Sequence, residues 1–147
     1  MSAKKVKKVF MDGAIQPEFI AASIAGHSAK TEIGAHAIFL GQVRADARGG
    51  SWVTAIEYTA YTEMAEEVLH RIREETFSKY PLSCMHIYHG LGTIRAGEIS
   101  LFVFTSSAHR NEAQEACREL VERIKAEVPV WGREILSDET YIWKENQ

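Results

Sequence analysis

The chain has 147 residues and a mass of 16.5 kDa, with 46% hydrophobic and 25% charged residues, which is the composition of one folded domain. Its net charge of −3 and isoelectric point near 6.1 exclude the basic excess of a general nucleic-acid-binding protein. No apolar run approaches the roughly 20 residues of a membrane span. Cys84 and Cys117 are typical of buried, reduced thiols, which indicates a cytoplasmic protein. We therefore expect a basic, flexible leader over residues 1–8 and a single domain over residues 9–147.

The first half of the chain predicts, in order, an edge strand at residues 9–11, a helix at 17–29, a strand at 34–45, a flexible glycine loop at 47–51 and a strand at 52–61. The helix is expected to begin at Pro17 because proline suits the first helical turn, and the acidic Glu18 suits the helix dipole. Within the longer apolar strand, Gly41 indicates a bulge or a close backbone approach.

The second half predicts, in order, a helix that begins at Thr62 and stops before Tyr80, strands at residues 84–88 and 99–105, a helix that begins near Asn111 and is closed by Pro129, and a short strand at 140–143. Both helices carry apolar residues at a spacing of 3.6. This order predicts an α+β fold, with a mostly antiparallel sheet that carries helices packed on one side.

Two histidines suggest a metal site that strand geometry argues against. His86 and His89 are three residues apart, and on a strand such residues point to opposite faces. They cannot both ligate one ion, and no cysteine or carboxylate cluster completes a site. The nearby glycines at 90, 92 and 97 precede a strand rather than a helix, which does not fit a dinucleotide-binding motif. We therefore expect neither a metal nor another cofactor.

The segment at residues 105–112 leaves a predicted strand and enters a helix, so its backbone N–H groups form a natural anion site. His109 and Arg110 lie at that position, and the arginine fork matches a phosphate or carboxylate. The alternative fits equally well: Ser106 and Ser107 are turn residues, and Arg110 is a surface cation.

Lys125 lies on the rim of the predicted last helix, where partial desolvation suits a lysine to proton transfer, although most rim lysines only extend to solvent. Together with Arg44, Arg110 and Arg133, it suggests a site for one anionic small ligand. Arg110 and Lys125 are 15 residues apart, which is about 22 Å along a helix. If both serve one site, two protomers must supply them, and the protein must be an oligomer.

Five short motifs occur in order along most of the chain. They are GAxxxFxGxVR at residues 34–44, EYxxYxxMAE at 57–66, GxxxxGE at 92–98, SAHR at 107–110 and IKxxVPxW at 124–131. Together they resemble the large, catalytic subunit of molybdopterin synthase. The resemblance covers residues 34–143.

The resemblance implies a sulfur transferase with an α/β-hammerhead fold that converts cyclic pyranopterin monophosphate to molybdopterin. Sulfur would arrive as the C-terminal thiocarboxylate of a small ubiquitin-like subunit, whose Gly-Gly tail enters the large subunit. Two large subunits would form a homodimer within a heterotetramer, and each active site would draw on both. No metal or membrane is implied for this subunit.

The resemblance assigns substrate binding to Gln42, Val43, Arg44, His109, Arg110, Lys125, Gly132, Arg133 and Glu134. The catalytic residues would be Lys125, Arg110 and His109, with Arg110 and His109 coming from the neighbouring protomer. Lys125 would either donate protons to the opening cyclic phosphate or stabilise charge on a thioester-like intermediate. Phe39 and Arg44 would line the channel for the partner's tail.

Two glycines depart from the family pattern. Gly90 stands where arginine is common, and Gly132 stands where lysine is common. We take Arg133 as the substitute for the missing lysine. The alternative function is a catalytically silent dimeric module that binds a ubiquitin-like partner or a phosphorylated metabolite.

Overall fold

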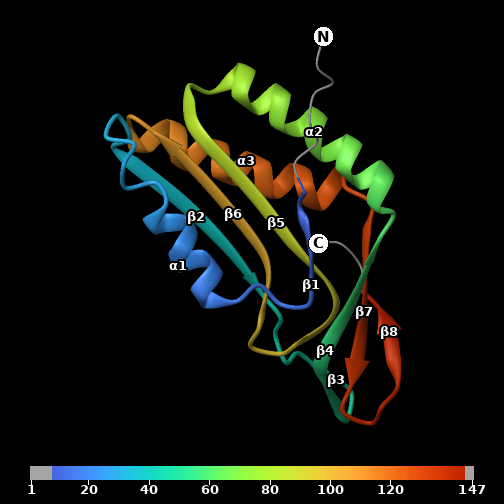
Figure 1. Ribbon diagram of the computed structural model, residues 1–147. Coiled ribbons are helices and arrows are strands. Elements are labelled where there is room, and N and C mark those ends of the chain that lie inside the picture. The colour runs from blue at the N-terminus through green and yellow to red at the C-terminus, as the bar shows by residue number, and fades with distance from the viewer. Residues whose placement is uncertain (1–7, 145–147) are drawn as a thin grey trace.

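The computed structural model describes residues 8–144, in which three helices and eight strands form (Figure 1). In chain order they are β1 (Phe10–Asp12), α1 (Pro17–Ala25), β2 (Ala35–Gln42), β3 (Ala47–Arg48), β4 (Ser51–Ala60), α2 (Thr62–Lys79), β5 (Leu82–Arg95), β6 (Ile99–Ser107), α3 (Arg110–Glu127), β7 (Val130–Leu136) and β8 (Tyr141–Trp143). Of the predicted leader, only Lys8 falls within the described residues. None of the helices in this part of the chain is long and apolar enough to cross a membrane.

The strands form one sheet in the order β2–β6–β5–β4–β7–β8, in which neighbouring strands are antiparallel. β1 joins β5 in parallel, and β3 pairs with β4 as a short hairpin. The first part of the long strand β5 pairs with β6, and its last part pairs with β4. β5 therefore connects the two halves of the sheet, and the predicted mostly antiparallel α+β fold is confirmed.

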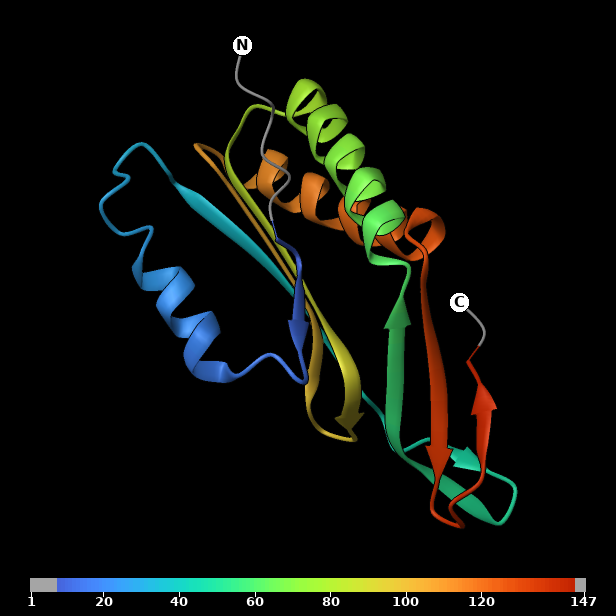
Figure 2. The same ribbon diagram turned by 45° about the vertical axis from the view of Figure 1, so that its right-hand side comes forward.

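Helices cover both faces of the sheet, as Figure 2 shows for α1 on one side and α2 and α3 on the other. Alternate residues of β6 point to the two sides. Leu101 and Val103 pack in the core formed with α2 and α3, whereas Phe102 and Phe104 pack with Ile20 of α1. The prediction that all helices lie on one side is therefore wrong. A strand buried on both faces has a continuous apolar run, which is the pattern of β6.

Two strands, β5 and β7, differ most from the sequence prediction. β5 continues through Gly90 and Gly92 to Arg95 instead of ending at Tyr88. β7 was not predicted at all, because its sequence VWGREIL interrupts the apolar alternation with a glycine and two charges. β7 nevertheless pairs with β4 over most of its length, so tertiary pairing overrides the weak local pattern.

The segment between β2 and β4 is more regular than the predicted loop. Ala47 and Arg48 pair with Trp52 and Ser51, so the turn is reduced to two glycines, of which Gly49 has a φ of 63°. The predicted bulge in β2 is confirmed, since the register shifts between Gly41 and Gln42. α1 ends at Ala25, four residues earlier than predicted.

Candidate active site

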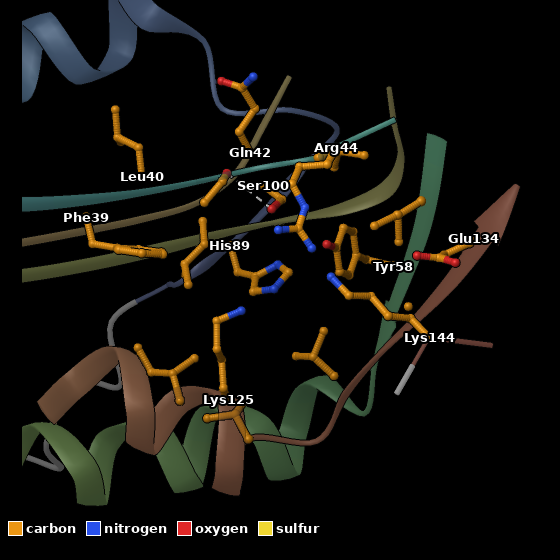
Figure 3. A pocket seen from close by; sticks show the side chains of 18 of the residues that line it. Phe39, Leu40, Gln42, Arg44, Tyr58, His89, Ser100, Lys125, Glu134 and Lys144 are labelled. Carbon is orange, nitrogen blue, oxygen red and sulfur yellow. Dashed lines mark hydrogen bonds between the residues drawn. The ribbon is translucent and has the colours of Figure 1, made fainter. Parts of the chain in front are cut away.

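A pocket of about 330 Å³ lies where the sheet meets the C-terminal end of α3 (Figure 3). β2 and the segment after it supply Phe39 and Arg44, β5 supplies His89, and α3 supplies Lys125. Lys144, which follows β8, completes this wall. The volume is that of a small-molecule site.

Three cationic side chains line this pocket: Arg44, Lys125 and Lys144 (Figure 3). Burial of the Lys144 ammonium, and then the nearby charge of Lys125, lower the pKa of Lys144. The Nε atom of Arg44 lies 3.3 Å from Oδ1 of Asp46, but the Arg44 side chain is 77% exposed, so this ion pair is weak. Because like charges repel in a shared pocket, the arrangement favours an anionic ligand between them.

His89 forms a neutral part of the wall, beside the rings of Tyr58 and Phe10 at centroid distances of 5.1 and 6.2 Å. Burial and the charge of Lys125 lower the pKa of His89 to about 4, against the opposing effect of its bond to Gly90. Its Nδ1 lies 2.7 Å from the carbonyl oxygen of Gly90. Because a carbonyl only accepts, Nδ1 carries the proton and Nε2 keeps a lone pair. His89 can therefore accept a proton or a hydrogen bond from a ligand.

Glu134 also lines the pocket, but its carboxylate already has a partner. The residue is 3% exposed, and Arg48 donates from Nε to Oε1 at 2.9 Å and from Nη2 to Oε2 at 3.1 Å. This bidentate ion pair attaches β3 to β7. Glu134 therefore acts as a buried anchor with its charge compensated.

The structure brings many of the predicted site residues together. Those that line the pocket are Phe39, Gln42, Val43, Arg44, Lys125, Gly132 and Glu134. His89 and Lys144 also line the pocket, and neither was predicted as a site residue. His89 was considered only as a metal ligand, and Lys144 has no local motif. Lys144 reaches the pocket because its backbone N–H donates to the carbonyl oxygen of Gly132 at 2.8 Å, which continues the pairing of β8 with β7.

Arg133 is not among the residues that line this pocket. Successive side chains of a strand point to opposite faces, so Arg133 points away from the face that carries Gly132 and Glu134. Its Nη2 lies 2.7 Å from Oε1 of Glu57, and its guanidinium lies 4.3 Å from the centre of the Tyr141 ring. The geometry therefore does not support Arg133 as a substitute for the missing lysine. The unpredicted strand β7 is the physical reason.

His109 and Arg110 lie at the opposite end of α3 from Lys125. The helix runs from Arg110 to Glu127, so about 22 Å of helix separates Arg110 from Lys125. Both residues are exposed, and neither lines the pocket. Within one chain, the structure does not bring them to Lys125.

The two unusual glycines differ in how tightly they are packed. A Cβ atom at position 90 would lie 2.3 Å from the carbonyl oxygen of Gly13 and 2.7 Å from Cδ1 of Ile94, so the β1–β5 contact excludes a side chain there. A Cβ atom at position 132 would lie 3.0 Å from Cγ2 of Ile56, which a small shift relieves. Gly90 is therefore a requirement of the fold, whereas Gly132 is not.

Comparison with known families gives one clear match. The family model described as MoaE protein matches residues 14–127. The molybdopterin synthase catalytic subunit of Pyrococcus abyssi is 43% identical over 108 residues, which are 74% of this chain and 72% of that protein. The rice protein of the same name (Oryza sativa subsp. indica) is 41% identical over 114 residues, which are 78% of this chain and 58% of that protein. The match therefore spans less than two thirds of the rice protein.

Solved structures with the same fold include a molybdopterin synthase from Staphylococcus aureus. It has a TM-score of 0.81 and 31% identity, and the match covers 93% of this chain and 96% of that one. A Helicobacter pylori structure, described as a complex of subunits 1 and 2 of molybdopterin-converting factor, has a TM-score of 0.80 but only 16% identity. It covers 95% of this chain and 90% of its own, and supports the fold alone.

Proposed function

The chain belongs to the MoaE protein family, and we propose that it is the catalytic subunit of a molybdopterin synthase. It would convert cyclic pyranopterin monophosphate to molybdopterin, with sulfur from the C-terminal thiocarboxylate of a small ubiquitin-like partner. Two relatives at 41% and 43% identity carry this name, which supports the activity.

The observation that best supports this function is the pocket in which Lys125 shares one cavity with Arg44 and Lys144. A cyclic phosphate substrate carries a negative charge, and the opened product carries more. Three cations around one cavity would stabilise both the bound substrate and the opened product. They would stabilise the product most, because it carries more negative charge. Lys144 would supply the cation that family members commonly place at position 132.

Lys125 is the proposed principal catalytic residue. From the end of α3 it faces the pocket that His89 and Tyr58 line from the other side (Figure 3). Its ammonium would donate a proton to the oxygen released when the cyclic phosphate opens, or stabilise charge on the thioester-like intermediate. The lone pair of His89 Nε2 is available to accept a proton or to hold a donor group of the substrate.

The partner's glycine tail is proposed to enter along β2. Phe39 and Gly41 of β2 line the pocket, and Arg44 lies just beyond the strand. A tail of glycines lacks side chains, so it would fit a channel lined by Phe39 and Arg44 that larger residues would block. Arg44 would also attract the thiocarboxylate.

A homodimer is proposed to complete each active site. His109 and Arg110 would come from the neighbouring protomer, since α3 separates them from Lys125 of their own chain. This arrangement would place a further arginine and a histidine beside the phosphate without any change in the fold of either chain.

A cytoplasmic location is also proposed. Cys84 and Cys117 are both buried and neither forms a disulfide. Unpaired thiols of this kind are typical of reducing compartments.

Reconstitution tests the proposed function. The protein is mixed with a thiocarboxylated small subunit and cyclic pyranopterin monophosphate, and the dithiolene product is quantified by mass spectrometry. We expect product from the unmodified chain and a loss of at least about 100-fold in Lys125→Ala, the range for removal of an acid–base group.

Lys79→Ala is the matched control, because Lys79 lies on α2 and pairs with Glu119 outside the pocket. We expect it to retain activity. Unchanged turnover in Lys125→Ala would contradict the mechanism. Binding of the small subunit without any product would instead favour the silent binding module.

A further inference from the structure

A second cluster of chemically active side chains lies apart from the pocket, where the turn after α1 meets β5. It consists of His27 from that turn and of Cys84 and His86 from β5. One donor atom from each residue, a ring nitrogen or the sulfur, lies within 4.8 Å of the other two. Cys84 and His86 are two residues apart on a strand, so they share a face, whereas His89 lies on the opposite face and lines the pocket. The cluster therefore belongs to the side of the sheet that α1 covers.

The tautomer of His27 is determined by its neighbour. Its Nδ1 lies 2.6 Å from the carbonyl oxygen of Ser23, which can only accept, so Nδ1 carries the proton. The lone pair on Nε2 therefore accepts a hydrogen bond from Nε2 of His86, 3.0 Å away. A histidine whose second nitrogen donates to a backbone carbonyl is the usual arrangement of a metal ligand, because the carbonyl fixes the ring and raises its basicity.

The spacing of the donors fits a small transition-metal ion. Metal–nitrogen bonds of about 2.0–2.1 Å and metal–sulfur bonds of about 2.3 Å at tetrahedral angles place the ligand atoms about 3.3–3.6 Å apart. The observed separations, 3.0 Å between the two Nε2 atoms and at most 4.8 Å within the set, lie on either side of this range. Small rotations of the side chains, together with displacement of the proton between the two Nε2 atoms by the metal, would therefore bring all three donors to one ion.

The sulfur of Cys84 already has a cationic neighbour. Nζ of Lys30 donates to Sγ at 2.9 Å, although the cysteine itself is only 6% exposed. Lys30 is exposed, so its ammonium can move into solvent when an ion takes its place. Thiolate and imidazole together select zinc-like ions over magnesium or calcium, which prefer oxygen ligands.

We propose that His27, Cys84 and His86 bind one divalent zinc-class ion, with the fourth coordination position open to solvent. The ion would attach the end of α1 to β5, on the face of the sheet opposite Lys125. This differs from the expectation of no metal, which considered His86 only together with His89. The proposal does not depend on the proposed sulfur transfer, because none of its three ligands lines the pocket.

Cobalt and zinc binding to the full-length, chelator-treated protein test the proposal. Co²⁺ is used as the spectroscopic probe, and Zn²⁺ affinity is measured by competition with a chromophoric chelator. We expect one ion per chain and a thiolate-to-cobalt charge-transfer band that is lost in Cys84→Ser. Zn²⁺ affinity should fall at least about tenfold in His27→Ala and in His86→Ala, the effect of losing a metal ligand or its support.

Matched controls are Cys117→Ser, which changes the other buried thiol, and His89→Gln, which changes the histidine on the opposite face. Both should bind cobalt like the unmodified protein. Circular dichroism of each metal-free variant shows whether it folds, and His86→Gln replaces His86→Ala if the latter does not. Absence of binding at micromolar Zn²⁺, or a charge-transfer band that survives Cys84→Ser, would overturn the proposal.

Discussion

Lys144 lines the pocket beside Gly132, the position at which the family resemblance predicts a lysine. Its ammonium shares the cavity with Arg44 and Lys125, and its pKa is lowered by burial and by Lys125. We expect Lys144→Ala to raise KM for the cyclic phosphate substrate about tenfold, since a hydrogen bond to a charged group contributes about 1.5–3 kcal/mol. Steady-state kinetics of the proposed sulfur transfer, in the reconstituted system, measure this change.

Gly132→Lys in the Lys144→Ala background tests whether a lysine at position 132 can replace Lys144. A Cβ atom at position 132 lies 3.0 Å from Ile56 and 3.3 Å from the Tyr58 ring, so a small displacement admits the new side chain. We expect the lysine to restore part of the lost affinity. An unchanged KM in Lys144→Ala would show that Lys144 does not contact the substrate.

The free energy of unfolding is expected to depend on pH through His89. Burial and Lys125 lower its pKa from 6.5 to about 4, so the unfolded chain binds a proton between these values while the folded chain does not. The stabilisation is therefore complete above pH 6.5 and is lost as the pH falls toward 4. We expect a loss on the order of 2 kcal/mol between pH 7 and pH 4.5, measured by urea unfolding. The loss should be clearly smaller in His89→Gln, and an equal loss would assign the effect to other groups.

At the scale of elements, β3 is attached to β7 by one ion pair. Arg48 donates twice to Glu134, which is 3% exposed. Arg48→Met should lower the free energy of unfolding by about 2 kcal/mol, because it leaves a buried carboxylate without its donors. Urea unfolding measures the change, and the double variant Arg48→Met/Glu134→Gln should recover part of it. The exposed pair of Lys79 is the control, since Lys79→Met should change stability by less than about 1 kcal/mol. A loss no larger than that of Lys79→Met would contradict this role.

Helices and strands with a strong local sequence pattern were predicted well, and those without one were missed. α2 and α3 were predicted within about two residues, because their apolar residues repeat at helical spacing. β7 was missed because its stability comes from pairing with β4 and not from its own sequence. Because β7 was missed, Arg133 was wrongly expected to point into the site. Recognition of β7 as a strand would have placed Arg133 on the opposite face from Gly132, whereas Lys144 becomes visible only once β8 is paired with β7.

At the scale of the whole molecule, sequence spacing alone predicted that Arg110 and Lys125 cannot share a site within one chain. The structure agrees in that the two residues lie 15 positions apart on one continuous helix, Arg110–Glu127, and only Lys125 lines the pocket. The surface that would join two protomers of the proposed dimer could not be predicted from the sequence, because pairing between chains leaves no periodic pattern. The shared site therefore needs a test in which the two residues are removed from different chains.

A hybrid dimer provides this test. Arg110→Ala and Lys125→Ala chains are co-expressed with different affinity tags, and dimers that carry both tags are isolated. If each site takes Lys125 from one protomer and Arg110 from the other, the hybrid keeps one complete site and loses both residues from the second. We expect about half of the unmodified activity per dimer, measured by reconstituted sulfur transfer, while each variant alone is nearly inactive. A hybrid as inactive as its parents would require both residues to act within one chain. The length of α3 would then force a bend or a different role for Arg110, so this result would contradict the shared site directly.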